Sequence, residues 1–188
     1  MSTKGDSKGS DSTPWYADGL RFGCTASGRC CSNHGEHAYV YLMEAEVQAL
    51  ADALGMEEAE FRRAHTREEE GWTLLEPQGT SCVFLSGTGQ CGVYEARPVQ
   101  CRTWPFWREN LASPEAFEAL VGSICKGAGC GRLYSAEQVL HIADSTEAWY
   151  EGELDAFPAS AQVGTAPERF PPVKGGASPI PTTPKRTA

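Results

Sequence analysis

The sequence contains no apolar run long enough to cross a membrane and no apolar core of a secretory signal peptide. A membrane-spanning helix needs about 20 consecutive apolar residues, and no stretch of the 188 residues approaches that length. The first six residues are hydrophilic, where a signal peptide would be followed by an apolar stretch. We therefore expect a cytoplasmic chain with no membrane partner.

Basic residues are also few. The chain has 16 Lys and Arg against 25 Asp and Glu, which gives a formal net charge of -9. Non-specific binding of nucleic acid needs a basic surface, so nucleic acid is not an expected partner. The hydrophobic share of 40% allows one modest core, to whose stability a bound metal would add.

Both ends of the chain lack the apolar periodicity of packed helices and strands. Residues 1–14 are rich in Ser, Gly, Lys and Asp, and residues 157–188 are rich in proline. Such compositions are typical of disordered segments. The sequence predicts a disordered N-terminal arm over 1–14, one domain over 15–156, and a disordered Pro-rich tail over 157–188.

Several short helices and strands are expected inside this domain. Val47, Leu50, Ala51 and Leu54 follow the spacing of one helix face, and Gly55 suits the left-handed residue that ends a helix. The predicted elements are strands at 38–42 and 72–75 and helices at 43–54, 57–65, 97–101, 113–121 and from residue 135 onward. They predict an α+β fold class: a small, partly irregular domain with short strands, a hairpin and several helices, organised around a cysteine-rich metal site.

The hairpin is expected at residues 82–85 and 91–94, which flank a loop with two glycines. With a four-residue loop, Phe84 faces Cys91. Cys82 and Cys91 then lie diagonally on one face, where their thiolates can converge on one metal ion.

Eight cysteines fall in one stretch of the chain, and neither end of the chain contains any. They are Cys24, Cys30, Cys31, Cys82, Cys91, Cys101, Cys125 and Cys130. In a reducing compartment, clustered thiols indicate metal ligation or redox chemistry. A secreted, disulfide-bonded chain is the alternative, and the hydrophilic N-terminus disfavours it.

The cysteine spacing excludes several familiar sites. Two knuckles of the C-x(2–4)-C type, which a zinc ribbon needs, are absent, as are a thioredoxin C-x-x-C and the tight three-cysteine cluster of radical enzymes. Eight cysteines exceed the four of one tetrahedral site. The excess favours a polynuclear site, an iron–sulfur cluster, or one site with spare thiols, and thiolates suit zinc or iron rather than magnesium or calcium.

Cys30 and Cys31 are adjacent, which raises a geometric question. In an extended segment they point to opposite sides. Both can bind one metal ion only if the backbone kinks there, which Gly28 could assist. Otherwise they serve two metals, or one binds while the other packs.

The cysteine-bearing segments resemble the bacterial cysteine-cluster family (CxxCxxCC, or YkgJ-type), described as a zinc- or iron-chelating domain. The segments are Phe22-Gly23-Cys24 through Cys30-Cys31, Cys82-Val83-Phe84-Leu85, Cys91-Gly92-Val93-Tyr94-Glu95-Ala96-Arg97-Pro98-Val99-Gln100-Cys101-Arg102-Thr103-Trp104-Pro105-Phe106, and Cys125-Lys126-Gly127-Ala128-Gly129. The resemblance covers about residues 20 to 134.

The resemblance implies a set of metal ligands. They are Cys24, Cys30, Cys31, Cys82, Cys91, Cys101 and Cys125. Ser27 stands where the family often has a cysteine, and a hydroxyl is a poor substitute ligand. Cys130 falls just beyond the family's late cysteine and ranks as the weakest candidate.

Other residues near the cysteines have two interpretations each. Arg97 and Arg102 either compensate the negative charge of a thiolate site or form local ion pairs. His34 and His37 either complete a mixed site or belong to a polar loop. The aromatic group of Trp104, Phe106 and Trp107 either shields a metal centre or is ordinary core; His65 and His141 are expected to be structural or exposed.

The sequence therefore predicts a metal-binding protein. The cofactor is iron, alone or as an iron–sulfur cluster, or zinc, and the role is structural, electron-transferring or metal-sensing. The alternative is a metal-dependent or redox enzyme acting on a small molecule or protein, although no general base is evident. Besides the metal, a protein partner is not specified by the sequence.

Overall fold

The structure, a computed structural model, describes residues 13–32 and 39–163. Its elements are β1 (Leu20–Phe22), η1 (Arg29–Cys31), β2 (Tyr41–Leu42), α1 (Glu44–Leu54), α2 (Glu58–His65), β3 (Thr66–Glu69), β4 (Trp72–Leu75), η3 (Tyr94–Ala96), α3 (Val99–Thr103), α4 (Arg108–Leu111), α5 (Pro114–Phe117), η4 (Glu118–Gly122), β5 (Arg132–Tyr134), α6 (Ala136–Tyr150) and η5 (Ala159–Ala161). The fold class is α+β, as the sequence predicts.

The first half of the chain builds a three-stranded antiparallel sheet, ordered β2-β4-β3, covered by α1 and α2. The apolar face of α1 is fully buried at Val47, Leu50 and Ala51, and Phe61 of α2 packs with it. Gly55 ends α1 with a φ of 65°, the left-handed conformation expected there. We call this apolar cluster the lower core.

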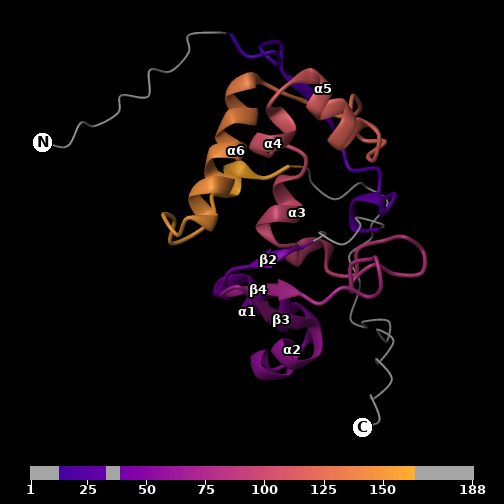
Figure 1. The fold of residues 1–188 in the computed structure, drawn as a ribbon, viewed down its shortest axis with the longest axis vertical. Helices are drawn as coiled ribbons and strands as arrows, with labels where there is room; N and C mark the ends of the chain where they lie inside the picture. Colours follow the sequence, from indigo (N-terminus) through magenta and orange to yellow (C-terminus); the bar gives the residue numbers. More distant parts are fainter. Residues whose placement is uncertain (1–12, 33–38, 164–188) are drawn as a thin grey trace, which may run out of the picture.

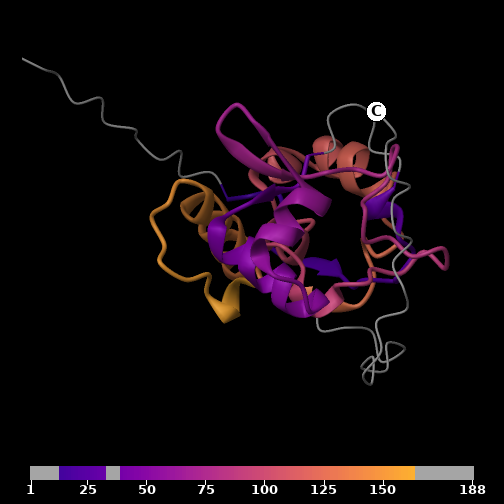
Figure 2. The same ribbon diagram turned by 90° about the horizontal axis from the view of Figure 1, so that it is seen from below.

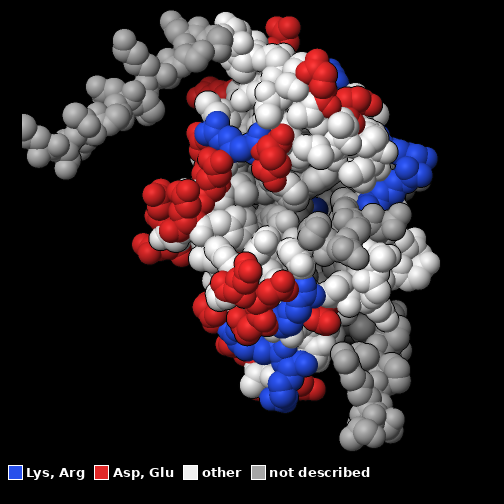
Figure 3. Space-filling model, viewed as in Figure 1, with Lys and Arg blue, Asp and Glu red and all other residues white. Residues whose placement is uncertain are grey.

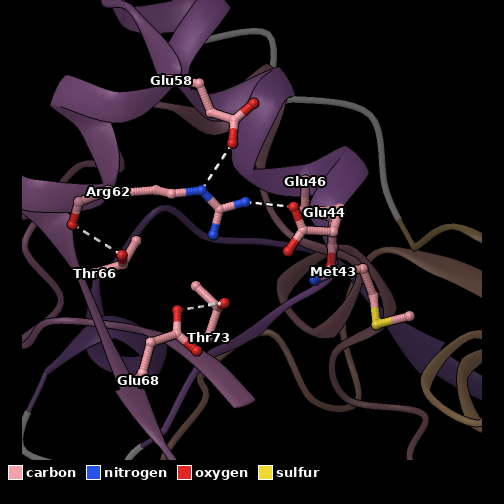
Figure 4. A network of polar contacts seen from close by, with 8 residues as sticks. All are labelled: Met43, Glu44, Glu46, Glu58, Arg62, Thr66, Glu68 and Thr73. Atoms are coloured by element: carbon pink, nitrogen blue, oxygen red, sulfur yellow. Dashed lines mark hydrogen bonds and ion pairs between the residues drawn. The ribbon is translucent and has the colours of Figure 1, made fainter. Parts of the chain in front are cut away.

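Arg62 ties the two helices of the lower core together at the surface (Figure 4). Its Nε donates to Glu58 on its own helix at 2.7 Å, and its terminal nitrogen pairs with Glu44 at the start of α1. Across the β3–β4 pair, the Thr73 hydroxyl donates to Glu68 at 2.7 Å. The two ion pairs of Arg62 are partly exposed, so each adds less than about 1 kcal/mol.

The second half of the chain, together with the N-terminal segment from Trp15 to Phe22, builds the other core, which we call the upper core, around α4, α5 and α6. Val139, Ile142 and Ala143 form the buried face of α6. Ser135 and Gln138 cap this helix reciprocally, as their spacing predicts. The helix α3 lies between the two cores, and the cysteine-rich loops lie on the side away from α6 (Figures 1 and 2).

The hairpin prediction was wrong in its detail. Residues 82–94 form turns rather than strands, and the pairing is shifted by one residue, so that Leu85 rather than Phe84 lies opposite Cys91. The reason is a longer turn: the Ser86 hydroxyl accepts from Gln90 N at 3.0 Å, which draws Gln90 into the loop.

The packed chain continues beyond the domain boundary expected at residue 156. Ala161 and Val163 are buried in the upper core, Phe157 packs against it, and Val163 N donates to Arg102 O at 2.8 Å. The expected boundary at residue 156 was too early because apolar residues lie within the Pro-rich tail, and composition averaged over the whole tail conceals them. The first twelve residues and those from 164 onward lie outside the described residues.

Within the described ranges, the longest helix is α6, and no helix is both long and apolar enough to cross a membrane.

Candidate metal centre

Gly28 produces the kink between the first cysteines. Its φ of 66° starts the short turn η1, in which Cys31 N donates to Gly28 O at 3.0 Å. The turn brings the Cys30 and Cys31 sulfurs to 3.8 Å from each other. Two thiolates bound to one tetrahedral ion at 2.3 Å lie about 3.8 Å apart. The backbone thus has the kink that binding of one ion by both cysteines would require.

The next two cysteines are attached to this turn through the backbone. Cys82 N donates to Cys31 O at 2.7 Å, and Ser32 pairs with Ser81. Cys91 lies opposite Leu85 across the loop that follows. The displaced register therefore still leaves Cys82 and Cys91 beside the double cysteine.

Cys101 lies in α3, whose first turn is held in place by a side chain of another helix. The Glu46 carboxylate of α1 accepts from Val99 N at 2.5 Å, and also from Met43 N at 2.8 Å and Trp149 Nε1 at 3.3 Å. Glu46 is only 5% exposed. Sequence reasoning missed this residue, because a glutamate beside other acidic residues in a helix resembles a solvated one.

Cys24 and Cys125 are brought together by the antiparallel pair of β1 and β5. Gly23 N donates to Gly127 O at 3.2 Å, and a Cβ at Gly127 would collide with the Gly23 carbonyl oxygen. Gly127 thus permits close packing of the loops next to the two strands.

One cavity of about 270 Å³ collects these segments. Six of the seven predicted ligands line it: Cys24, Cys30, Cys31, Cys82, Cys91 and Cys101. The seventh, Cys125, is buried beside Trp104, which itself lines the cavity. Cys130 and Ser27 are exposed and do not line it.

Four of the thiols share one local hydrogen-bond pattern. The sulfur accepts from the backbone N–H two residues further along the chain, which is Ala26 for Cys24, Phe84 for Cys82, Val93 for Cys91 and Gly127 for Cys125. Backbone donors favour the negative thiolate over the thiol, and hydrogen bonds to sulfur are one of the ways in which proteins tune thiolate-bound iron.

The thiols hinder one another's ionisation. The hydrogen bond with Cys31 lowers the pKa of Cys30 to about 7, whereas that same bond and burial raise the pKa of Cys31. Burial raises the pKa of Cys91 to about 11 and that of Cys101 well above its usual value, and the neighbouring thiols add to both shifts. Several thiolates held this close would need a cation such as a metal ion to balance their charge.

The two arginines expected near the site have different places. Arg97 lines the cavity, stacks on Tyr94 with 3.7 Å from its guanidinium carbon to the ring centroid, and opposes the rise in the pKa of Cys91 and Cys101. Arg102 does not line the cavity, and its guanidinium carbon lies 5.7 Å from the ring centroid of Phe157. Within the described residues, its buried Nε has no hydrogen-bond partner.

The aromatic and histidine residues singled out in the sequence also lie in different places. Trp104 and Trp107 line the cavity, whereas Phe106 is fully buried in the upper core. His65 packs against Phe61 and Phe84, and His141 is exposed. His34 and His37 lie outside the described residues.

The thiols line the cavity rather than converge on a point. Among residues 13–32 and 39–163, no three Cys, His, Asp or Glu side chains are gathered closely enough to hold a metal ion as they stand. Binding therefore needs the cysteine side chains to turn inward. In its chemistry, an all-cysteine donor set fits zinc or iron.

Comparison with protein families gives the same assignment. Residues 23–131 match the family CxxCxxCC, described as "Putative zinc- or iron-chelating domain". This match covers more than half of the chain, so the chain belongs to the CxxCxxCC family. No solved structure matches the chain.

Proposed function

We propose that this chain chelates more than one zinc or iron ion through Cys24, Cys30, Cys31, Cys82, Cys91, Cys101 and Cys125. The observation that carries the proposal is the gathering of six of these cysteines, from four separate segments, on the wall of one cavity. A packing role alone does not account for it, because buried structural thiols pack against apolar groups, whereas these face a common space.

A polynuclear centre is favoured over a single ion. One tetrahedral ion uses four thiolates at about 2.3 Å, and the cavity of about 270 Å³ offers six thiols with a seventh behind them. The backbone donors to sulfur support either an iron–sulfur cluster or several ions bridged by thiolates. The metal domain would extend from residue 15 to 163, since both ends pack on the upper core.

Metal analysis of protein purified without oxygen tests the proposal. We expect at least two iron or zinc ions per chain. Iron with an equal amount of acid-labile sulfide would identify an iron–sulfur cluster, and zinc without sulfide would identify chelated ions. A single ion per chain would contradict the polynuclear centre, and a fully folded chain without metal would contradict chelation itself.

A pair of substitutions tests the ligand set. Cys101→Ser removes a thiol of the cavity wall, so the metal content per chain and the melting temperature should both fall. Cys130→Ser is the matched control, because this exposed cysteine does not line the cavity. Equal metal content in the two variants would remove Cys101 from the set.

A further inference from the structure

A second, larger cavity lies on the other side of α3. Its volume is about 460 Å³, within the range of small-molecule sites. It is open to solvent and bounded by α6, the start of α4, and the edge formed by β2 and β4. Its wall carries the rings of Tyr41, Trp72 and Tyr150 and the charged groups of Arg108, Glu147 and Glu151.

Gln100 and Trp107 line both cavities, so they form the wall between them. The Gln100 side chain is fixed in place, accepting from Tyr41 N at 3.1 Å and donating to Tyr39 O at 3.0 Å. Trp107 Nε1 donates to Thr103 at 3.0 Å. The second cavity is thus a separate and preformed space next to the cysteine cavity.

Aromatic rings enclose one end of this space. Tyr41 and Trp72 meet nearly at right angles, with centroids 5.4 Å apart and an interplanar angle of 77°. Trp72 and Tyr150 follow at 6.4 Å and 62°. Trp72 remains 37% exposed. Ring faces carry negative electrostatic potential, and rings set at angles around one space attract an organic cation.

The charged residues of the wall also favour a cation. Glu109, Glu147 and Glu151 supply three carboxylates against one guanidinium, that of Arg108. Arg108 is itself neutralised, because it pairs with Glu147 at 3.1 Å and with Asp144. Acidic side chains gather around α6 on this face (Figure 3). An anion would meet repulsion here, and a neutral ligand would gain nothing from the carboxylates.

We propose that this second cavity binds a small organic cation, an alkylated ammonium headgroup that lies against Tyr41, Trp72 and Tyr150 with the carboxylates at its rim. The binding does not depend on the metal centre, so its failure would leave the proposed chelation untouched.

The test compares choline with 3,3-dimethylbutan-1-ol, which has nearly the same shape without the charge. Both are titrated into the full-length protein, with tryptophan fluorescence and calorimetry as readouts. We expect saturable binding of choline with a Kd near or below about 1 mM, and binding of the neutral alcohol that is weaker by about tenfold. Equal affinities, or no saturable binding of choline, would overturn the proposal.

Two variants and a control locate the site. Trp72→Leu should weaken choline binding about tenfold by removing a ring, and Glu151→Gln should weaken it about threefold by removing a charge near the surface. Glu137→Gln, the same charge change on the exposed first turn of α6, should leave it unchanged. If Trp72→Leu lowers the metal content or fails to fold, the Glu151→Gln variant decides instead, because Glu151 is exposed. An effect of Glu151→Gln on choline binding equal to that of Glu137→Gln would show that the ligand binds elsewhere.

Discussion

At the scale of single residues, Gly28 has the largest local consequence. A side chain there would combine an unfavourable φ of 66° with a collision against the Gly89 carbonyl oxygen. Since the turn it starts sets the 3.8 Å separation of the Cys30 and Cys31 sulfurs, Gly28→Ala should open the cysteine cavity. We expect it to lower the free energy of unfolding by about 2 kcal/mol or more and to reduce the metal content per chain.

Gly55 provides the matched control for this substitution. It has nearly the same φ, 65°, but an added Cβ would meet nothing within 4 Å. Gly55→Ala should therefore cost about 1 kcal/mol of stability and leave the metal content unchanged. The two variants are compared by denaturant unfolding and metal analysis. Similar metal contents would show that the turn at Gly28 does not affect metal binding.

His65 gives the protein a pH dependence that is distinct from metal release. Burial lowers its pKa below the ordinary value of 6.5. The unfolded chain then binds a proton at a higher pH than the folded chain does, so the stability that His65 contributes is present above about pH 6.5 and is lost as the pH falls towards its folded pKa. Its ring packs between Phe61 and Phe84 at 5.4 and 5.5 Å.

Replacing His65 with leucine should reduce this pH dependence, because leucine fills the apolar space without titrating. Urea unfolding near neutral pH and at about pH 5.5 measures it. The native chain should lose more of its free energy of unfolding over this range than His65→Leu does, and loss of metal affects both alike. Parallel curves for the two proteins would show that His65 does not titrate on unfolding.

At the scale of elements, α3 is too short to be stable by itself, and Glu46 compensates for this. A five-residue helix has little intrinsic stability in water. Glu46 belongs to α1, and its carboxylate accepts from Met43 N at the start of that helix, from Val99 N at the start of α3 and from Trp149 Nε1 of α6. A single carboxylate thus connects three helices. The position of Cys101 on the cavity wall depends on this connection.

Glu46→Gln tests the role of this carboxylate. The amide keeps the shape but turns an NH₂ group towards backbone or indole donors, so at least one buried hydrogen bond is lost. We expect the free energy of unfolding to fall by about 2 kcal/mol. Glu44→Gln, two residues away at the surface, should cost less than about 1 kcal/mol, and equal losses in urea unfolding would contradict a special role for Glu46.

The elements that sequence patterns predicted are those with local signals. Apolar spacing and a terminal glycine define α1, and the pair of Ser135 and Gln138 defines the start of α6. The loop at 86–90 escaped prediction because one side-chain hydrogen bond, Ser86 to Gln90, lengthens it by a residue. The grouping of the cysteines was predicted through the family resemblance, whereas the contributions of Glu46 and of the backbone donors to sulfur depend on tertiary contacts.

At the scale of the whole molecule, two cores lie on either side of α3 (Figure 1), and the cysteine-lined cavity lies beside this helix. The cavity takes its walls from the opening segment, the loops after β4, and α3. A bound metal would therefore connect segments that are distant in sequence, and its binding free energy would add to the stability of the fold as a unit.

The upper core also depends on residues 157–163. Their contribution is hard to recognise in the sequence, because they lie within the Pro-rich tail. Val163 is 4% exposed and Ala161 is fully buried, and Val163 N donates to the carbonyl of Arg102, the residue after Cys101. A chain ending at residue 156 should therefore be less stable than one ending at 163 by about 3 kcal/mol, the value expected for burying this apolar surface. Because Val163 contacts the end of α3, the shorter chain should also bind less metal. Urea unfolding and metal analysis of the two chains measure both effects, and equal values would show that the domain is already complete at residue 156.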